Sequence, residues 1–142
     1  MQIYLSGGMS GLTYVEQMRW RYDITSVILD KCDNHDIRPY PNFFSPPEYY
    51  RVGESLHKSE REVMEFDLYK LRTSDLVIVN FNSPNSIGTA MELMLARELR
   101  IPIVGLLEDE DANLHPWLVE CCGRIFSNLD ELSDYVVLYY LL

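Results

Sequence analysis

The sequence predicts an α/β fold in which one parallel sheet carries helices on both faces. Two segments, 75–80 (DLVIVN) and 101–106 (IPIVGL), are nearly continuous runs of β-branched and other apolar residues. Such runs are typical of parallel strands that are buried on both faces. Segments with apolar residues at helical spacing lie before and after them along the chain. Strands that alternate with helices in this way form parallel sheets.

The first quarter of the chain predicts a strand, a turn and a long helix. Residues 2–6 (QIYLS) favour a strand, and Gly7-Gly8 directly after them indicates a turn. Apolar residues then recur at helical spacing over 13–31. Thr13 and Glu16 match a capping box, so we expect the helix to begin there.

The rest of the chain completes the doubly wound pattern. A short extended piece is expected at 37–40, and four prolines in the loop RPYPNFFSPPEYY (38–50) argue against a regular helix there. The other expected elements are helices at 54–73, 87–99 and 129–142, a helical turn at 115–121 and a strand at 124–126. Five strands in a single domain that spans 1–142 correspond to a flavodoxin-like doubly wound fold.

The size and charge of the chain exclude several classes of function. The 142 residues are enough for one ordinary domain, and a net charge of −10 opposes binding to a nucleic-acid polymer or an anionic membrane surface. No apolar run is long enough to span a bilayer, and the N-terminus opens into a strand-like segment without a basic leader. The three cysteines are odd in number and lack the spacing of metal ligands. We therefore expect a cytoplasmic protein with reduced thiols, no metal and no cofactor.

Charged and apolar residues are unevenly distributed along the chain. Residues 101–142 hold eight acids and one base, whereas five of the twelve bases fall within 51–72. The acidic total therefore opposes a long phosphate polymer but not a small phosphorylated substrate. The segment 135–142 (YVVLYYLL) is too apolar for a solvated helix end, so we expect a homo-oligomer, a dimer or larger.

The fold class indicates where a ligand should bind. In doubly wound sheets, ligands lie beyond the carboxyl ends of the strands, near the point where the strand order reverses. Three segments are expected around that crevice, namely 6–12, 80–92 and 107–116.

The first of these segments is rich in small residues. In Ser6-Gly7-Gly8-Met9-Ser10-Gly11, small side chains would let a ligand approach the backbone, and N–H groups at the next helix can face an anion. The segment is neither a Walker loop nor a GxGxxG fingerprint. A glycine-rich turn of this kind is structural about half the time, so both interpretations stay open.

The second segment opens a helix and places Glu92 one turn inside it. Gly88 costs roughly 1 kcal/mol against alanine in a helix, which makes sense if something packs closely against that turn. Glu92 emerges from an otherwise apolar surface that includes Met91, so a partly desolvated carboxylate would serve as nucleophile or base. The alternative is a glutamate that is favoured only by the helix dipole.

Asp67 is the companion of Glu92 in this hypothesis. Its neighbours Phe66 and Leu68 are apolar, and two carboxylates that converge on one sugar are what glycosidic chemistry requires. On the residues alone, a solvated acid or a partner for Lys70 is slightly favoured. Tyr4 lies beside the glycine turn, where a strand tyrosine is usually a core aromatic.

The aromatic loop offers a further candidate contact. Phe43, Phe44 and Tyr49 are candidates to stack on a heterocyclic base. The alternatives are a subunit contact and a lid over the edge of the sheet.

Three groups of residues lie in a recognisable order along the chain. They are IYLSGG (3–8), Asp67-Leu68 followed by SDLVIV (74–79), and SIGTAME (86–92). In this combination the sequence resembles the nucleoside 2-deoxyribosyltransferases and their relatives, the 2′-deoxynucleoside 5′-monophosphate N-glycosidases. The resemblance spans nearly the whole chain, and its most specific element is the Gly-x-x-x-Glu helix after a β-branched strand.

The resemblance implies a function and a set of site residues. Glu92 would attack the anomeric carbon of a deoxyribosyl donor and release the base, after which a second base or water would take the sugar. Tyr4 would hydrogen-bond and orient Glu92, and Asp67 would contact the sugar or assist protonation of the leaving base. The expected substrate-binding residues are Ser6, Gly7, Gly8, Ser10, Ser86, Gly88 and Thr89.

The sequence departs from the family pattern at three places. Transferases that act on free nucleosides usually have an aspartate six positions before the nucleophile, whereas Ser86 stands here, as in the monophosphate N-glycosidases. Gly8 stands where those glycosidases have another phosphate-binding serine, although Ser10 is close. The segment 121–123, where a neighbouring subunit usually lends a polar residue, has no Asn or Ser.

Two other functions compete with a glycosidic enzyme. One is a nucleotide-binding sensor or regulatory module that keeps the crevice without turnover. The other is a flavin- or sugar-phosphate-binding protein that shares only the doubly wound sheet.

Overall fold

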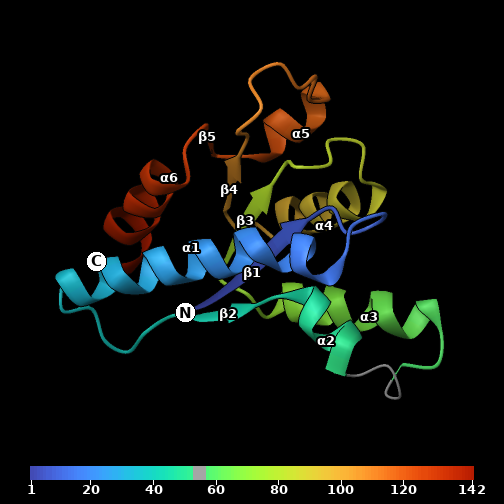
Figure 1. Cartoon of the computed structure of the whole chain (residues 1–142), viewed down its shortest axis with the longest axis horizontal. Helices are drawn as coiled ribbons and strands as arrows, with labels where there is room; N and C mark the ends of the chain where they lie inside the picture. The colour runs from blue at the N-terminus through green and yellow to red at the C-terminus, as the bar shows by residue number, and fades with distance from the viewer. Residues whose placement is uncertain (53–56) are drawn as a thin grey trace.

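The computed structural model describes residues 1–52 and 57–142, in which five parallel strands form one sheet in the order β2-β1-β3-β4-β5 (Figure 1). The strands are β1 (Gln2–Gly7), β2 (Asn42–Phe44), β3 (Leu76–Asn80), β4 (Ile103–Leu106) and β5 (Arg124–Phe126). This strand order reverses between β1 and β3, as in flavodoxin-like sheets. The predicted fold class is therefore confirmed.

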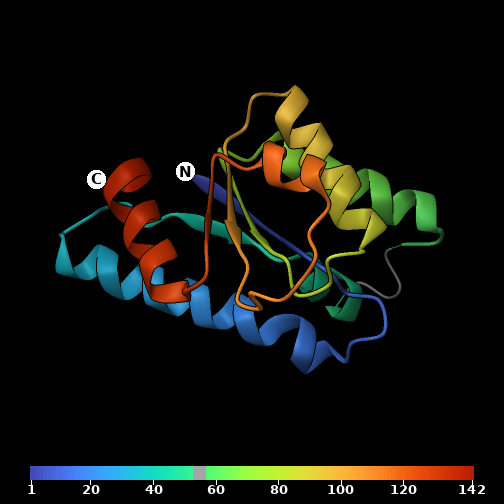
Figure 2. The same ribbon diagram turned by 90° about the horizontal axis from the view of Figure 1, so that it is seen from above.

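Helices cover both faces of the sheet (Figure 2). One face carries α1 (Tyr14–Asn34), α6 (Leu129–Val136) and the π-helical turn η1 (Val137–Leu141). The opposite face carries α3 (Glu60–Arg72), α4 (Ile87–Glu98) and α5 (Pro116–Cys121), while α2 (Pro46–Val52) follows β2 at the edge. No helix in the described part of the chain is long and apolar enough to cross a membrane.

The strands are buried on both sides because their alternate residues serve two cores. Ile3 and Leu5 of β1 pack with α1 and α6, whereas Tyr4 packs with the residues of α3 and α4. This alternation follows from the two-residue period of a strand. It places Tyr4 and Ser6 on the α4 side of the sheet, which decides the geometry of the site below.

Helix α1 begins as the sequence predicts. The Thr13 hydroxyl accepts a hydrogen bond from the backbone N–H of Glu16 at 3.2 Å, and the Glu16 carboxylate accepts one from the Thr13 N–H at 3.4 Å. This reciprocal capping box satisfies two of the N–H groups that a helix start leaves open.

The proline-rich segment differs from the prediction in two ways. The strand lies at 42–44 and not at 37–40, because Pro39 and Pro41 lack the N–H that pairing requires. Residues 46–52 form a helix despite Pro46 and Pro47, since the first helical turn needs no N–H donor.

Two helix boundaries also differ. The predicted start at Glu54 lies outside the described residues, but residues 57–59 are described and are not helical, and α3 begins at Glu60 with Ser59 as its N-cap. The C-terminal helix changes to π-helical geometry at Val137.

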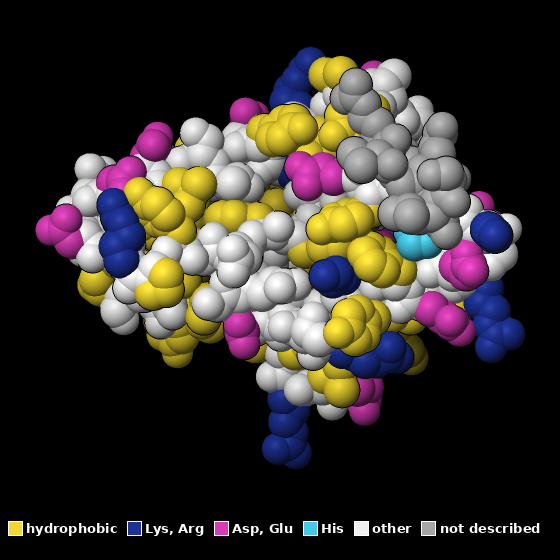
Figure 3. Space-filling model, turned by 90° about the horizontal axis from the view of Figure 1, so that it is seen from below, with side chains coloured by type: hydrophobic (Ala, Val, Ile, Leu, Met, Phe, Trp, Pro, Cys, Tyr) yellow, Lys and Arg dark blue, Asp and Glu magenta, His cyan; other side chains and the backbone are white. Residues whose placement is uncertain are grey.

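The surface charge is mixed on the side of the molecule beneath β2 and α2. Figure 3 shows Lys and Arg side chains interspersed with Asp and Glu on this side, with apolar groups between them. The net charge of −10 is therefore not gathered on that face.

Candidate active site

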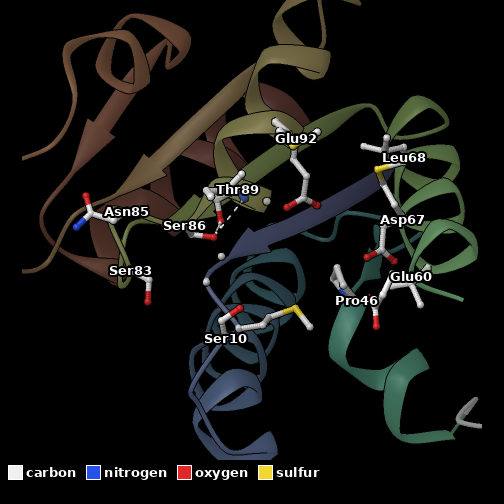
Figure 4. Close-up of a pocket in the computed structure, with 18 of the residues that line it drawn as sticks. Ser10, Pro46, Glu60, Asp67, Leu68, Ser83, Asn85, Ser86, Thr89 and Glu92 are labelled. Atoms are coloured by element: carbon white, nitrogen blue, oxygen red, sulfur yellow. Dashed lines mark hydrogen bonds between the residues drawn. The ribbon is translucent and has the colours of Figure 1, made fainter.

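A cavity of about 1160 Å³ opens at the carboxyl ends of β1 and β3, the strands between which the strand order reverses. Its walls come from the β1–α1 loop, the first turns of α4 and one side of α3 (Figure 4). Two of the three predicted segments, 6–12 and 80–92, contribute to it. None of the residues 107–116 lines it, because they follow β4, one strand further from the reversal.

Glu92 projects from α4 into this cavity (Figure 4). The Tyr4 hydroxyl donates a hydrogen bond to its Oε2 atom, and the Ser6 hydroxyl donates one to Oε1 at 3.2 Å. Tyr4 and Ser6 are completely buried and lie two positions apart on β1, so both hydroxyls reach α4 from the same face of the strand. Each carboxylate oxygen therefore has a fixed donor.

The pKa of Glu92 is raised from its ordinary value of 4.5 to about 7. Burial is the main cause, and the negative charge of Asp67 contributes to the increase. The hydrogen bonds from Tyr4 and Ser6 and the positive charge of Arg21 lower this pKa, but they do not offset burial. A carboxyl group that titrates near neutral pH inside a cavity is characteristic of a functional site.

Asp67 lies opposite Glu92, on α3. Its half-buried carboxylate points into the cavity from the other side (Figure 4), so the two acids face one space from two helices. Glu60, two turns earlier on α3, lines the same wall. The sequence alone slightly favours a solvated Asp67 or a partner for Lys70. The structure instead places Asp67 in the wall of the cavity.

The start of α4 forms a polar part of the cavity wall, in the turns that precede Glu92 on the same helix. Ser86 is the N-cap of this helix, and its hydroxyl accepts hydrogen bonds from the Thr89 N–H at 3.3 Å and the Thr89 hydroxyl at 3.0 Å. Both residues line the cavity while engaged with each other. Apart from the neighbouring residues and the backbone of α4 itself, no described protein atom lies within 4 Å of the position that a Cβ would occupy at Gly88, so that turn faces open space.

The glycine turn has a packing reason of its own. A Cβ on Gly8 would lie 2.3 Å from the Cβ of Ser83, and a Cβ on Gly7 would lie 2.9 Å from the Trp20 ring. The Gly8 N–H also donates to Asn82 Oδ1 at 3.3 Å. Gly8 therefore lets the β1–α1 loop press against the β3–α4 loop, Gly7 leaves room for the Trp20 ring of α1, and both glycines line the cavity as well.

One predicted site residue has a different position from the one expected. Ser6 is absent from the cavity wall and is completely buried beneath it, where it contacts Glu92. The other expected substrate-binding residues line the cavity: Gly7, Gly8, Ser10, Ser86, Gly88 and Thr89.

The candidate aromatic side chains Phe43, Phe44 and Tyr49 do not line the cavity. Phe44 is buried in the core, where it packs against the ring of Tyr4 with 5.2 Å between centroids. Tyr49 stacks on Phe44 at 4.9 Å. Stacking of a base on these rings is therefore not supported, because they fill the core beside β1.

The bases of the segment 51–72 whose side chains the structure describes also lie away from the cavity. The side chain of Arg51 lies outside the described ones, and the other four bases do not line the cavity. Lys70, for example, lies over the Phe66 ring, and Arg61 pairs with Glu65. Within the described lining, the charged side chains are the acids Glu60, Asp67 and Glu92.

Sequence reasoning missed the apolar wall and Arg21. Val63, Met64 and Leu68 of α3 and Met91 of α4 line the cavity, although they read as ordinary helix positions. Met64 and Met91 remain about half exposed, which only the structure reveals, so nothing in the sequence set them apart from other apolar helix positions. Among the described residues, no three His, Cys, Asp or Glu side chains come together as metal ligands.

Comparison with known proteins shows the fold. No protein-family model matches the chain, and no curated protein is significantly similar to it in sequence. A 2-deoxyribosyltransferase from Bacillus psychrosaccharolyticus superposes with a TM-score of 0.73 at 16% identity, over 95% of this chain and 92% of that one. The chain has the fold of that enzyme.

Two further solved structures are similar. A conserved protein from Enterococcus faecalis V583 gives a TM-score of 0.75 at 19% identity, over 94% of this chain and 95% of that one. The CMP N-glycosidase of Clostridium botulinum gives 0.58 at 18% identity, over 98% and 99%. At the level of the fold, these likenesses confirm the resemblance that the sequence suggests.

Proposed function

We propose that this protein is a member of the nucleoside 2-deoxyribosyltransferase family that cleaves the N-glycosidic bond of a 2′-deoxynucleoside or its 5′-monophosphate. The observation that carries this proposal is the Glu92 carboxylate, held by Tyr4 and Ser6 in a cavity that it shares with Asp67. Two proteins of the same fold, a 2-deoxyribosyltransferase and a CMP N-glycosidase, are named for such chemistry.

In the first step, Glu92 is the nucleophile. A bond forms between its carboxylate and C1′ of the sugar while the bond from C1′ to the base nitrogen breaks, and the base leaves with the electron pair. The reacting species is the carboxylate, so the hydrogen bonds from Tyr4 and Ser6 orient Glu92 and, by lowering its pKa against the effect of burial, favour its ionised form. Asp67 faces the same space, where it contacts the sugar or supplies the proton that the departing base needs.

In the second step, the glycosyl ester on Glu92 is opened. A second base would regenerate a nucleoside, and water would release the free sugar. The cavity of about 1160 Å³ exceeds the roughly 300–1,000 Å³ of ordinary small-molecule sites, so it has room for a sugar and for an incoming base.

The two walls of the cavity suggest how the donor lies. The hydroxyls of Ser10, Ser86 and Thr89 and the open backbone at Gly88 suit the 5′ end of the sugar. The dipole of α4 favours a phosphate at its N-terminus. The apolar side chains of Met64 and Leu68 suit the face of a base.

The alternative function is a sensor or regulatory module that binds nucleotides without turnover. The arrangement of Glu92 favours the enzyme, because a carboxylate that two buried hydroxyls orient towards a second acid across one cavity is typical of catalytic sites. A sensor would bind nucleotides equally well after Glu92→Ala and release no base.

The deciding experiment is the intact mass of the protein after it reacts with 2′-fluorinated deoxyribosyl donors, supplied as nucleosides and as 5′-monophosphates. We expect a covalent adduct on the wild type and on Glu98→Ala, an exposed change on the same helix, but not on Glu92→Ala. Absence of both an adduct and base release from every donor, in folded protein, would refute the proposal.

We also propose that the enzyme acts in the cytoplasm as a homo-oligomer. Its three cysteines are free, which suits a reducing compartment. Apolar side chains stay exposed on α4 and α5, where Ile87 is 76% and Trp117 is 71% exposed, and on the C-terminal turn, where Tyr139 is 68% exposed. A second copy of the chain would bury such side chains.

A further inference from the structure

Arg21 is a fully buried cation beneath the site. Only 1% of its surface is exposed, and its guanidinium lies 4.6 Å from the centre of the Trp20 ring. Its Nε donates to the carbonyl of Leu5 at 3.2 Å, Nη2 to that of Gly7 at 3.4 Å and Nη1 to that of Gln17 at 2.5 Å. Two of these donors join α1 to the end of β1, and the third bonds a carbonyl of α1 itself.

The sheet explains why these donors are needed. Strand β2 pairs with β1 only as far as Tyr4, whereas β1 continues to Gly7 beside β3. Leu5 and Gly7 thus lie beyond the last residue of β2, and their carbonyls accept from Arg21 where a neighbouring strand would otherwise donate. The Arg21 guanidinium thus supplies the hydrogen-bond donors that a longer β2 would provide.

The same helix also holds the loop that follows β1. Gln17, one turn before Arg21, donates from Nε2 to the carbonyls of Met9 at 2.9 Å and Leu12 at 3.0 Å. Because Arg21 bonds the Gln17 carbonyl, the contacts to the strand and to the loop form one connected network.

The residues that Arg21 holds alternate with those that hold Glu92. Leu5 and Gly7 accept from Arg21, while Tyr4 and Ser6 donate to Glu92. We propose that Arg21 is a positioning residue of the active site: its fork fixes the end of β1 and thereby the two hydroxyl groups that hold the nucleophile. This inference rests on the proposed function of Glu92.

The charge of Arg21 adds a second effect. Taking a guanidinium out of water is costly, and a neutral donor would satisfy a carbonyl equally well. The positive charge lowers the pKa of Glu92, against burial and the charge of Asp67, and so favours the reactive carboxylate. The polar and charged groups around Glu92 are Tyr4 and Ser6 on β1, Arg21 on α1, Asp67 and Glu60 on α3, and His57 before α3.

The test separates the fork from the charge with two substitutions. Arg21→Met removes both, and Arg21→Lys keeps the charge but loses the planar fork. Arg19→Met is the control, because Arg19 is an exposed cation two positions away on α1. Thermal unfolding reports whether each variant folds, and the carbon-13 shift of the Glu92 carboxyl against pH reports its ionisation without any substrate.

We expect Arg21→Met to move the Glu92 titration to higher pH and to lower kcat on the order of tenfold below neutral pH, with a smaller change in KM. Arg21→Lys should restore the titration but leave kcat low, and Arg19→Met should match the wild type. A titration and kcat that are unchanged in a folded Arg21→Met protein would overturn the inference. Because the titration needs no turnover, a protein inactive on every donor would refute the proposed function and still leave the effect of Arg21 on Glu92 measurable.

Discussion

The hydroxyl of Tyr4 donates a hydrogen bond to Oε2 of Glu92, a residue 88 positions later in the chain. Tyr4 is completely buried on the central strand, and Glu92 opens onto the cavity from α4. The contact therefore ties the carboxylate that we propose as the nucleophile to the rigid sheet. Tyr4 lowers the pKa of Glu92, whereas Asp67, across the cavity, raises it.

Tyr4→Phe should shift the pH dependence of the reaction upward. The hydrogen bond lowers the pKa of Glu92, so its loss raises that pKa, and the reactive carboxylate exists only above it. We expect the acidic limb of kcat/KM to move to higher pH and kcat to fall about 10- to 100-fold. Tyr69→Phe, at an exposed position on α3, is the control and should leave the profile in place.

Replacing Glu92 should stabilise the fold at alkaline pH. Its pKa is about 7 in the folded protein against 4.5 ordinarily, so the folded state holds the proton more tightly and stability is lost as pH rises from 4.5 through 7. Glu92→Gln should therefore raise the free energy of unfolding at pH 8 by about 1–2 kcal/mol, with no gain near pH 4. Urea unfolding at both pH values checks this, with Glu98→Gln as the matched change on the exposed side of α4. An equal gain at both pH values would show that the charge is not the cause.

Two glycines of the cavity wall should respond in opposite ways to the same substitution. A Cβ on Gly8 would meet the Ser83 Cβ at 2.3 Å, so Gly8→Ala forces two loops apart and should cost about 2 kcal/mol or more. A Cβ on Gly88 meets no described atom within 4 Å, and alanine suits a helix better, so Gly88→Ala should gain up to about 1 kcal/mol. Thermal unfolding distinguishes the two. If the open space at Gly88 receives substrate, the stabilised Gly88→Ala protein should nevertheless show a raised KM.

Self-association should depend on the apolar side chains of α5 and of the C-terminal turn. Trp117 and Tyr139 are exposed and large, so a charge at either position would be buried without a partner in an interface. Sedimentation should show a dimer or larger assembly for the wild type and a shift toward monomer for Trp117→Lys or Tyr139→Lys. Tyr22→Lys, at an exposed position on α1, is the control. A wild type that is monomeric at working concentration would contradict the proposal.

The sequence predicted those elements whose signals are local. The capping box of α1 and the β-branched run of β3 need no partner to be recognised, and the structure places both as expected. The prediction misplaced β2 because the position of this strand depends on its pairing with Gln2–Tyr4. It missed α2 because prolines are tolerated in the first turn of a helix, although they break a helix further along.

The site shows the same division between local and distant causes. Glu92 could be selected because a carboxylate stood alone on an apolar helix surface. Ser6 was expected to bind substrate and Arg21 was not singled out, because their roles arise from which face of β1 meets α4 and from where β2 ends. Those relations exist only once the strands are side by side.

Asp67→Asn should change the pH profile in the opposite direction to Tyr4→Phe. The negative charge of Asp67 raises the pKa of Glu92, so its removal lowers that pKa and the acidic limb should move to lower pH. If Asp67 also assists the leaving base, kcat should fall about 10²- to 10⁴-fold on donors whose base needs a proton to depart. Donors with a good leaving group, such as a deoxyribosyl fluoride, should lose far less.

Asp23→Asn, an exposed change on α1, is the control for the loss of one carboxylate. A profile that moves upward would contradict the electrostatic coupling of the two acids, and an equal loss on every donor would restrict Asp67 to holding the sugar.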